Sequence, residues 1–286
     1  MAAVALNIRH LEGPHGGRFK AQLDAGIVEL DYARSATALD FHHTGTSPAL
    51  QGQGLAAQIV AHGMGWAAAQ GLPVVPSCTY VAAWLRRNPR WQRLLIAAEP
   101  QAVLNFWFGV LGSPEDGQIR KRWFIKDAAF DAEIRDRFGA LLDQAQAGAL
   151  RSWHDRGWAQ LALIVLLDQF GRNIHRGHAR SFAGDALALA ASLEMLDAGI
   201  ELEPLAQWFL LMPLEHAEDL AMQDRSVAEF TRLAARDARL ADANAYAHKH
   251  REVIVRFGRY PHRNAILGRA STPDEASYLA QPGAGF

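Results

Sequence analysis

The sequence contains one cysteine, no long apolar run and no excess of charge of one sign. The single Cys78 excludes an internal disulfide framework and is typical of a reducing compartment. The longest unbroken apolar stretch, Leu161 to Leu167, is far shorter than the roughly 20 residues that span a bilayer. The first residues, MAAVALNIRH, lack the basic segment and long apolar core of a secretory signal. We therefore expect a cytoplasmic protein that does not enter a membrane.

The charge of the chain is balanced, with a formal net charge of -1 at pH 7 over 286 residues. A protein that binds nucleic acid usually concentrates Lys and Arg in one segment or on one face. Neither the first 95 residues nor the rest of the chain has such an excess in total charge, so nucleic acid is not an expected partner. Half of the residues are hydrophobic and 21% are charged, which is enough for the cores of two modest domains.

The first part of the chain mixes strand-like and helical segments. Alternating apolar residues, separated by turn residues, indicate strands, and helical periods with a terminal glycine indicate helices. Strands are expected over 19–23, 26–34, 38–44 and 72–76, and helices over 55–70 and 80–87. A strand, a helix and a further strand in this order form a crossover on a mixed sheet. This pattern predicts an α+β domain over residues 1–95.

The stretch QGQGLA, from Gln51 to Ala56, places two glycines directly before a predicted helix. A helix N-terminus leaves backbone N–H groups unpaired and carries a partial positive charge. Because Gly52 and Gly54 have no Cβ, an anion can approach the backbone closely. The turn therefore suggests a phosphate site, although a plain strand-to-helix turn explains the glycines about equally well. A P-loop is disfavoured, because no Gly-Lys-Ser/Thr sequence follows.

Several motifs around this turn occur in order: a His-Thr-containing strand, the Gln51, Gly54 and Ala56 pattern, a helix and a Pro-x-Cys. Together they resemble a small bacterial subfamily of the GNAT family N-acetyltransferases, over about residues 7 to 95. The resemblance implies transfer of an acetyl group from acetyl-CoA to an amine of a small molecule or protein, without a metal. The residues that it implies for acetyl-CoA binding are Thr44, Thr46, Gln51, Gly52, Gln53, Gly54, Leu55 and Ala56.

Direct attack of an amine on a thioester needs a base for the amine and an acid for the departing thiolate. Tyr80 is the candidate acid, and His43 or His42 the candidate base. Cys78 is a candidate nucleophile near a helix N-terminus. Tyrosine and free cysteine also often serve packing alone. A rival hypothesis is that the domain holds CoA without catalysis, as a sensor or scaffold.

From about residue 99 the sequence shows helical periods only. Helices are expected over about 118–125, 127–147, 155–170, 182–198, 204–211, 214–236 and 239–257. Two further helix starts are predicted at Ser113-Pro114-Glu115-Asp116 and at the capping box that begins at Thr272. The pattern predicts an all-α domain over residues 96–286, joined to the first domain by a short linker at about 91–100.

Four stretches of this helical part carry a second resemblance. They are RWFIKDAAFDAEI, LLDQFGRNIHRG, MPLEHAEDLAMQDRS and RFGRYPHRNAILGRASTPDE. They resemble a bacterial domain of unknown function assigned to the tetratricopeptide-like helical superfamily. The resemblance implies a fold and no activity.

The same stretches place polar residues beside large apolar ones. Glu215, Glu218 and Asp219, at i, i+3 and i+4, predict an acidic face on one helix. We expect this face to meet a basic corner formed by Arg256, Arg259 and Arg263. The candidate site residues are Asp168, Arg172, Glu215, His216, Arg259, His262 and Arg263.

Three interpretations of this cluster stay open. The first is a buried structural ion network, and the second is a site for an anionic or protein ligand. A metal site is the least favoured of the three and is not expected. A further hypothesis places an enzymatic activity in the helical domain itself.

Overall fold

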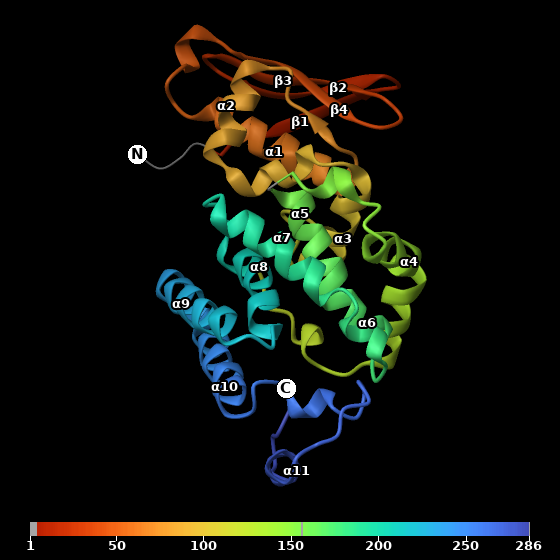
Figure 1. Cartoon of the computed structure of the whole chain (residues 1–286). Coiled ribbons are helices and arrows are strands. Elements are labelled where there is room, and N and C mark those ends of the chain that lie inside the picture. The colour runs from red at the N-terminus through yellow and green to blue at the C-terminus, as the bar shows by residue number, and fades with distance from the viewer. Residues whose placement is uncertain (1–4, 156, 286) are drawn as a thin grey trace. The chain divides into compact units, whose positions relative to one another are not determined.

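The computed structural model describes residues 5–155 and 157–285. The chain divides into two compact units, of which the first ends at Gln118 and the second begins at Ile119. Among the described residues, the strands belong to the first unit, and the second unit is built of helices (Figure 1).

The first unit is organised around one mixed sheet of five strands in the order β1-β2-β3-β4-β5. Neighbours from β1 to β4 pair antiparallel, and β5 pairs parallel to β4 after the crossover. The strands are β1 (Ile8–Gly13), β2 (Gly16–Leu23), β3 (Gly26–Arg34), β4 (Leu39–Thr46) and β5 (Val74–Val75). The predicted mixed sheet is therefore confirmed. The sequence did not predict β1, because this edge strand is mostly exposed and has little apolar alternation.

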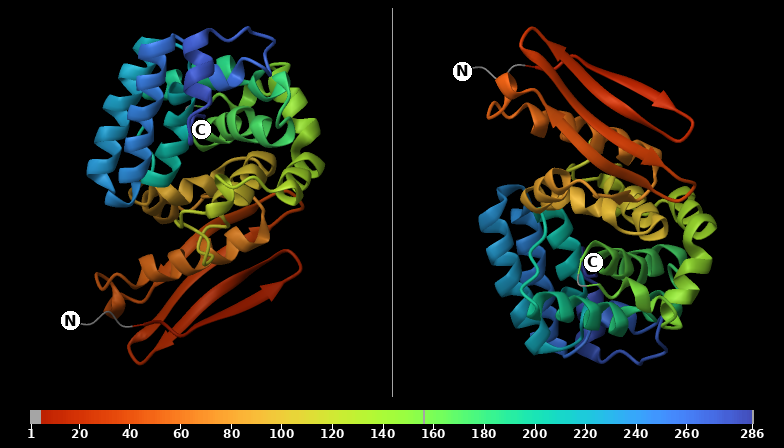
Figure 2. Two further views of the ribbon diagram at one scale, coloured as in Figure 1. Left: turned by 90° about the horizontal axis from the view of Figure 1, so that it is seen from below. Right: turned by 90° about the horizontal axis from the view of Figure 1, so that it is seen from above.

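One face of the sheet is apolar because alternate residues of each strand point to the same side. Phe19, Leu30 and Phe41 are fully buried there, and helix α1 (Leu55–Gln70) lies across this face (Figure 2). A Cβ at Gly63 of α1 would lie 2.5 Å from the Cδ2 atom of Leu30. The glycine thus lets the helix pack closely on the sheet.

The opposite face of the sheet is charged. The guanidinium of Arg18 on β2 donates to the carboxylate of Asp31 at 2.6 Å and lies 3.0 Å from Glu29, both on β3. The two faces therefore differ as expected for an antiparallel sheet that is covered on one side.

The segment that joins the predicted domains is helical. After α2 (Thr79–Arg87) the chain forms a 3-10 helix over Pro89–Leu95 and then α3 (Ala98–Phe108). The stretch predicted as a linker, at about 91–100, is therefore mostly helical.

The helix start predicted at Ser113 is wrong, because the chain forms turns there. The side chain of Asp116 accepts the N–H of Gly112 at 2.7 Å and binds the guanidinium of Arg90. Asp116 therefore closes a turn that leads away from helical geometry.

The second unit confirms the predicted all-α architecture. Its main helices are α4 (Ala128–Gln146), α5 (Trp158–Ile164), α6 (Gly171–Ile174), α7 (Asp185–Asp197), α8 (Pro204–His216), α9 (Leu220–Arg236), α10 (Ala241–Phe257) and α11 (Pro273–Leu279). Helices α9 and α10 lie side by side, and Thr272 forms the predicted capping box with Glu275 at the start of α11 (Figure 1). None of the helices in the described part of the chain is long and apolar enough to cross a membrane.

Three predicted helices differ in the structure. The helix expected over 118–125 is only a short 3-10 helix, at Lys121–Trp123. The helix expected over 155–170 passes through a π-helical segment at Val165–Phe170 and continues into α6. The helix expected over 214–236 is interrupted, because α8 ends at His216 and the Asp219 side chain caps the next helix by accepting the N–H of Met222. Glu215, Glu218 and Asp219 therefore do not share one helical face.

Candidate functional site

The glycine turn before α1 is an open stretch of backbone. Gly52 and Gly54 both have φ of +75°, a conformation that side chains other than glycine rarely adopt, and a Cβ at either position would meet nothing within 4 Å. Gly54 is the N-cap of α1, and as a glycine it has no side chain that could accept a hydrogen bond from the first N–H groups of the helix. The first N–H groups of a 16-residue helix thus point toward an exposed, uncharged turn. Such a turn can accept the phosphate groups of a ligand.

The two glutamines of the turn stabilise its shape. The Nε2 atom of Gln51 donates to the carbonyl of Thr46 at 3.3 Å, and that of Gln53 donates to the carbonyl of Ala49 at 3.1 Å. Both hydrogen bonds connect the turn to the end of β4 and the short 3-10 helix that follows it. The two glutamines are exposed, as are Gly52 and Gly54, so the whole turn is accessible to a ligand.

Strands β4 and β5 separate close to this turn. Their parallel pairing involves only Leu39 and Asp40 with Val74 and Val75, whereas β4 runs on to Thr46. Beyond the paired residues β4 has no strand neighbour on that side among the described residues. The free part of β4 includes the predicted binding residues Thr44 and Thr46.

Cys78 lies where the two strands separate. Its N–H donates to the carbonyl of Phe41 at 2.9 Å, and its Sγ atom donates to the hydroxyl of Thr44 at 3.4 Å. Burial alone would raise the pKa of the Cys78 thiol, but hydrogen bonds with Thr44 and with the backbone at the start of α2 outweigh this effect, and the pKa is lowered. Cys78 is also the N-cap of α2.

The other predicted catalytic residues lie on different surfaces. Tyr80, in the first turn of α2, is half-buried against the core of the first unit. His42 is the extra residue of a β-bulge, because Asp31 pairs with His43 and Tyr32 pairs with Phe41. In a regular strand the side chains of His42 and His43 would point to opposite faces of the sheet. The bulge at His42 interrupts this alternation.

Both histidines are exposed, and the Nε2 atom of His43 lies 3.8 Å from Glu29 on the charged face of the sheet. Cys78 and Thr44 are thus brought together, and His43 is held apart from them.

The second unit contains a buried ion network that begins on the π-helix. A π-helix often marks a functional position, because the extra residue in the turn redirects side chains. Here it carries Asp168, which is only 1% exposed. Asp168 accepts hydrogen bonds from Gln169 at 2.6 Å and His216 at 2.7 Å, and lies 3.0 Å from Arg172. Burial opposes ionisation of this carboxyl, but Arg172 and His216 outweigh it and hold its pKa well below the usual range.

Arg172 connects the π-helix with the start of α7. Its two terminal nitrogens donate to the two oxygens of Asp185 at 2.9 and 3.0 Å. This bidentate pair depends on a close backbone approach, since a Cβ at Gly184 would lie 2.6 Å from the carbonyl oxygen of Leu167. Asp185 was not predicted, although a Gly-Asp pair at a helix start is a recognisable signal.

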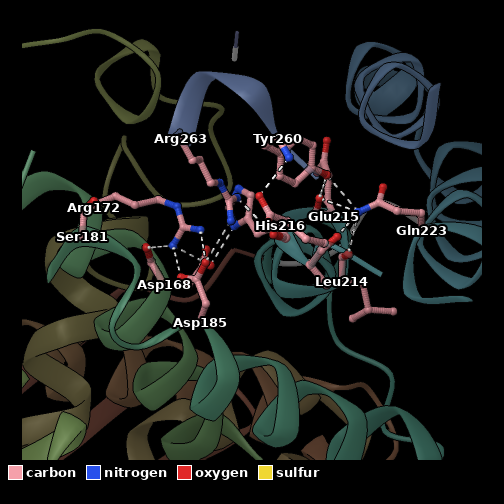
Figure 3. Close-up of polar contacts among 12 residues, drawn as sticks. Asp168, Arg172, Ser181, Asp185, Leu214, Glu215, His216, Gln223, Tyr260 and Arg263 are labelled. Carbon is pink, nitrogen blue, oxygen red and sulfur yellow. Dashed lines mark hydrogen bonds and ion pairs between the residues drawn. The ribbon is translucent and has the colours of Figure 1, made fainter. Parts of the chain in front are cut away.

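His216 and Arg263 complete the network (Figure 3). The guanidinium of Arg263 donates to the carbonyl of His216 at 3.0 Å and lies 3.4 Å from Asp185. Burial lowers the pKa of the His216 imidazole and Arg172 lowers it further, against the opposing effect of Asp168. The structure thus brings together four predicted residues, namely Asp168, Arg172, His216 and Arg263.

The remaining predicted residues have other partners, so the expected meeting of an acidic face with a basic corner is wrong. Glu215 lies in the core, 2.7 Å from the Nδ1 atom of His250. Glu218 accepts two hydrogen bonds from Arg269, which was not predicted. Arg259 pairs with Glu275 at 2.7 Å, and the guanidinium of Arg256 lies over the ring of Phe257. The ring of His262 lies beside that of Tyr260, with centroids 5.5 Å apart.

Two family models match the chain, and the boundary between them lies between residues 94 and 103. Residues 18–94 match the GCN5-related N-acetyl-transferase family. Residues 103–283 match the family described as bacterial protein of unknown function (DUF924). The second match covers more than half of the chain, and the chain therefore belongs to this DUF924 family. It carries in addition an N-terminal GCN5-related acetyltransferase domain, which suggests acetyltransferase activity at the level of the family.

The chain also resembles a solved structure. The chain is similar to a protein of unknown function from Agrobacterium tumefaciens, with 35% identity and a TM-score of 0.57. The match covers 65% of this chain and 98% of that one. This similarity shows that about two thirds of the chain resembles a known fold, and it indicates no activity.

Proposed function

We propose that the first unit is an N-acetyltransferase that uses acetyl-CoA as its acetyl donor. The observation that carries this proposal is the open turn at Gly52 and Gly54, which lies inside the segment that matches the GCN5-related family. Its positive φ angles leave backbone N–H groups accessible where a side chain would otherwise stand. The pyrophosphate of acetyl-CoA would bind to this turn, held by residues 51 to 56, with Thr44 and Thr46 beside the pantetheine arm.

The proposed reaction is direct transfer to an amine. The amine nitrogen attacks the carbonyl carbon of the thioester, the C–S bond breaks and the acetyl group becomes an amide. The amine loses one proton and the departing CoA thiolate gains one, so that the products are the N-acetylated amine and free CoA.

The candidate residues have separate roles in this reaction. Tyr80 would donate the proton to the thiolate. His43 stays the predicted base, and its side chain lies apart from Cys78 and Thr44, on the charged face of the sheet. Cys78 is the weaker candidate, because direct transfer needs no acyl-enzyme. Its hydrogen bond to Thr44 favours a structural role at the point where β4 and β5 separate.

The acceptor is an amine of a small molecule or of a protein. The second unit would bind a protein or an anionic ligand, and its likeness to the tetratricopeptide-like superfamily stays a prediction. The rival function is a domain that binds CoA without transfer. It is separated from the proposal by measuring the release of free CoA with a panel of amines.

The turn is tested by a pair of substitutions on one helix. Gly54→Val should abolish acetyl-CoA binding in calorimetry, because the side chain blocks the approach to the backbone and strains the turn. Gly71→Val is the matched control. Gly71 caps the other end of α1, has φ of +66° and also has open space around its Cβ position. The two variants should lose similar stability, of about 1 kcal/mol or more.

The proposal requires that only Gly54→Val loses acetyl-CoA. Equal affinity in the wild type and in a folded Gly54→Val protein would refute the site, and equal losses in both variants would show that strain alone is responsible.

A further inference from the structure

A pocket of about 320 Å³ lies beside the ion network of the second unit. It is formed by the start of α7, the end of α8, the loop that follows and the 3-10 helix at Pro261–Arg263. The polar residues that line it are Asp185, His216, Glu218, Asp219 and Arg263. A pocket of this size suits a small metabolite.

Arg263 lines this pocket, and its guanidinium has one donor that no group within the described residues accepts. The residue is 7% exposed, and its guanidinium is held between the rings of Phe182 and Tyr260, at 4.7 and 4.5 Å from their centroids. One terminal nitrogen donates to the carbonyl of His216, while the contact with Asp185 is long at 3.4 Å. Within the described residues the buried Nε atom has no hydrogen-bond partner. A buried N–H without an acceptor is costly, and a ligand oxygen in the pocket would satisfy it.

His216 offers the complementary group. Because Asp168 is ionised, the Nδ1 atom of His216 donates to it, and in the neutral ring Nε2 must then be the unprotonated nitrogen. The described part of the chain provides no hydrogen-bond partner for Nε2, and the side chain is 13% exposed where it lines the pocket. His216 can therefore take up a proton at Nε2 without losing its contact with Asp168.

The charges of the network balance when His216 is neutral. Asp168 and Asp185 carry two negative charges, and Arg172 and Arg263 carry two positive charges. An entering monoanion would leave one negative charge in excess, which a proton on His216 removes. We propose that this pocket binds a small monocarboxylate, held by Arg263, and that His216 takes up one proton as the ligand enters.

The acidic rim of the pocket disfavours a doubly charged ligand such as phosphate more than a monoanion. Asp185, Glu218 and Asp219 line the pocket, and only Glu218 has an arginine partner outside the network, Arg269. A second negative charge on the ligand would be repelled most by Asp219, because the charge of Asp185 is already balanced within the network. The Nε and Nη2 edge of an arginine also matches the two coplanar oxygens of a carboxylate.

Protonation of His216 depends on every charged group around it. Burial and Arg172 lower its pKa, whereas Asp168 and Asp185 raise it. The titratable and charged groups on the elements that pack around it are Asp168, Arg172, Asp185, Glu215, Glu218, Asp219, His250, Tyr260, His262 and Arg263. A ligand carboxylate at Nε2 adds a further favourable interaction, so the bound state has the higher pKa and binding strengthens as pH falls.

The test uses calorimetry of the full chain with acetate, benzoate and inorganic phosphate, each in two buffers of different ionisation enthalpy. Acetate or benzoate should bind with net proton uptake, and more tightly at pH 6 than at pH 8. Arg263→Gln should weaken this binding at least tenfold. Arg259→Gln is the matched control, because Arg259 lies four residues earlier, pairs with Glu275 and does not line the pocket.

His216→Asn provides the second test. The Asn amide can still donate to Asp168, but it has no group that takes up a proton. Carboxylate binding to this variant should therefore be weaker and without proton uptake, even if Arg263→Gln fails to fold. Absence of carboxylate binding to the wild type, binding without proton uptake, or unchanged proton uptake in His216→Asn would each overturn the proposal. Tighter binding of phosphate than of either carboxylate would overturn the choice of ligand.

Discussion

The two candidate sites are built from opposite kinds of group. The turn at Gly52 and Gly54 offers backbone N–H groups in an open, uncharged loop. The pocket of the second unit is lined by charged side chains such as Asp185 and Arg263, which come from helices far apart in the sequence. A change in the turn should affect binding and leave the core of its unit intact. A change in the network should affect stability as well, because the same contacts hold its helices together.

Asp168→Asn is the strongest test of this contrast. The substitution keeps the volume and removes a buried charge that holds Arg172 and His216. We expect a loss of about 3 kcal/mol in the free energy of unfolding, near the lower end for a broken buried pair, because Arg172 keeps Asp185. Chemical denaturation measures it. Asp197→Asn is the control, since Asp197 forms an exposed pair with Arg225 and should cost at most about 1 kcal/mol. Equal losses in the two variants would contradict the role of the network.

In the first unit, Tyr80→Phe should lower activity and leave stability nearly unchanged. If Tyr80 donates the proton to the thiolate, removal of its hydroxyl should lower kcat about 100-fold, with little change in the melting temperature. Cys78→Ala should keep most of the rate, because direct transfer needs no thiol nucleophile. Steady-state release of CoA measures both variants. An acetylated Cys78 that transfers its acetyl group to the acceptor would contradict this assignment.

His262, which lies outside the network but is affected by the charge of Arg263, allows the stability of the second unit to be tested by pH. Burial and the neighbouring Arg263 lower the pKa of this imidazole to about 4, below its ordinary value of 6.5. The folded protein therefore binds the proton less well than the unfolded chain, and stability is lost as pH falls from about 6.5 to 4. By pH 4.5 the loss should reach about 2.5 kcal/mol, and in His262→Gln this part of the loss should be absent. Parallel denaturation curves at pH 7 and 4.5 give the comparison, and an equal acid loss in both proteins would contradict it.

Arg259→Met should have the smallest effect. The side chain of Arg259 is 30% exposed, and its partner Glu275 keeps hydrogen bonds from the backbone of Thr272 and from Asn264. The melting temperature should therefore change much less than in Asp168→Asn. A shift as large as that of Asp168→Asn would mean that Arg259 belongs to the stabilising network after all.

Local signals in the sequence predicted much of the fold. The limits of α1 follow from Gly54 and Gly71, both in the left-handed conformation, and the start of α11 follows from the capping box at Thr272. The motifs around Gln51 also indicated the family of the first unit, which the match over residues 18–94 supports. These signals succeed because each depends on residues within one turn of the chain.

Such local signals could not predict the features that depend on tertiary contacts. The π-helix at Val165–Phe170 has the same apolar pattern as an α-helix, so nothing in its sequence marks the extra residue. The bulge at His42 likewise appears only when β4 pairs with β3. The partners of Glu215 and Arg259 were misassigned because charge alone does not specify which distant groups meet. Asp168, Arg172, His216 and Arg263, which are four of the seven candidate residues, lie together in the structure, but the sequence did not indicate the carboxylate of Asp185 that connects them.

The position of Arg263 in the chain has a consequence for biosynthesis. It contacts Asp185 across 78 residues, a stretch that a ribosome adds in about 4 to 16 seconds. During that interval Asp168, Arg172 and Asp185 can already pair, since they are close in sequence, while the wall of the pocket that Arg263 forms does not yet exist. The nascent chain therefore exposes the half-built pocket after the glycine turn of the first unit is complete.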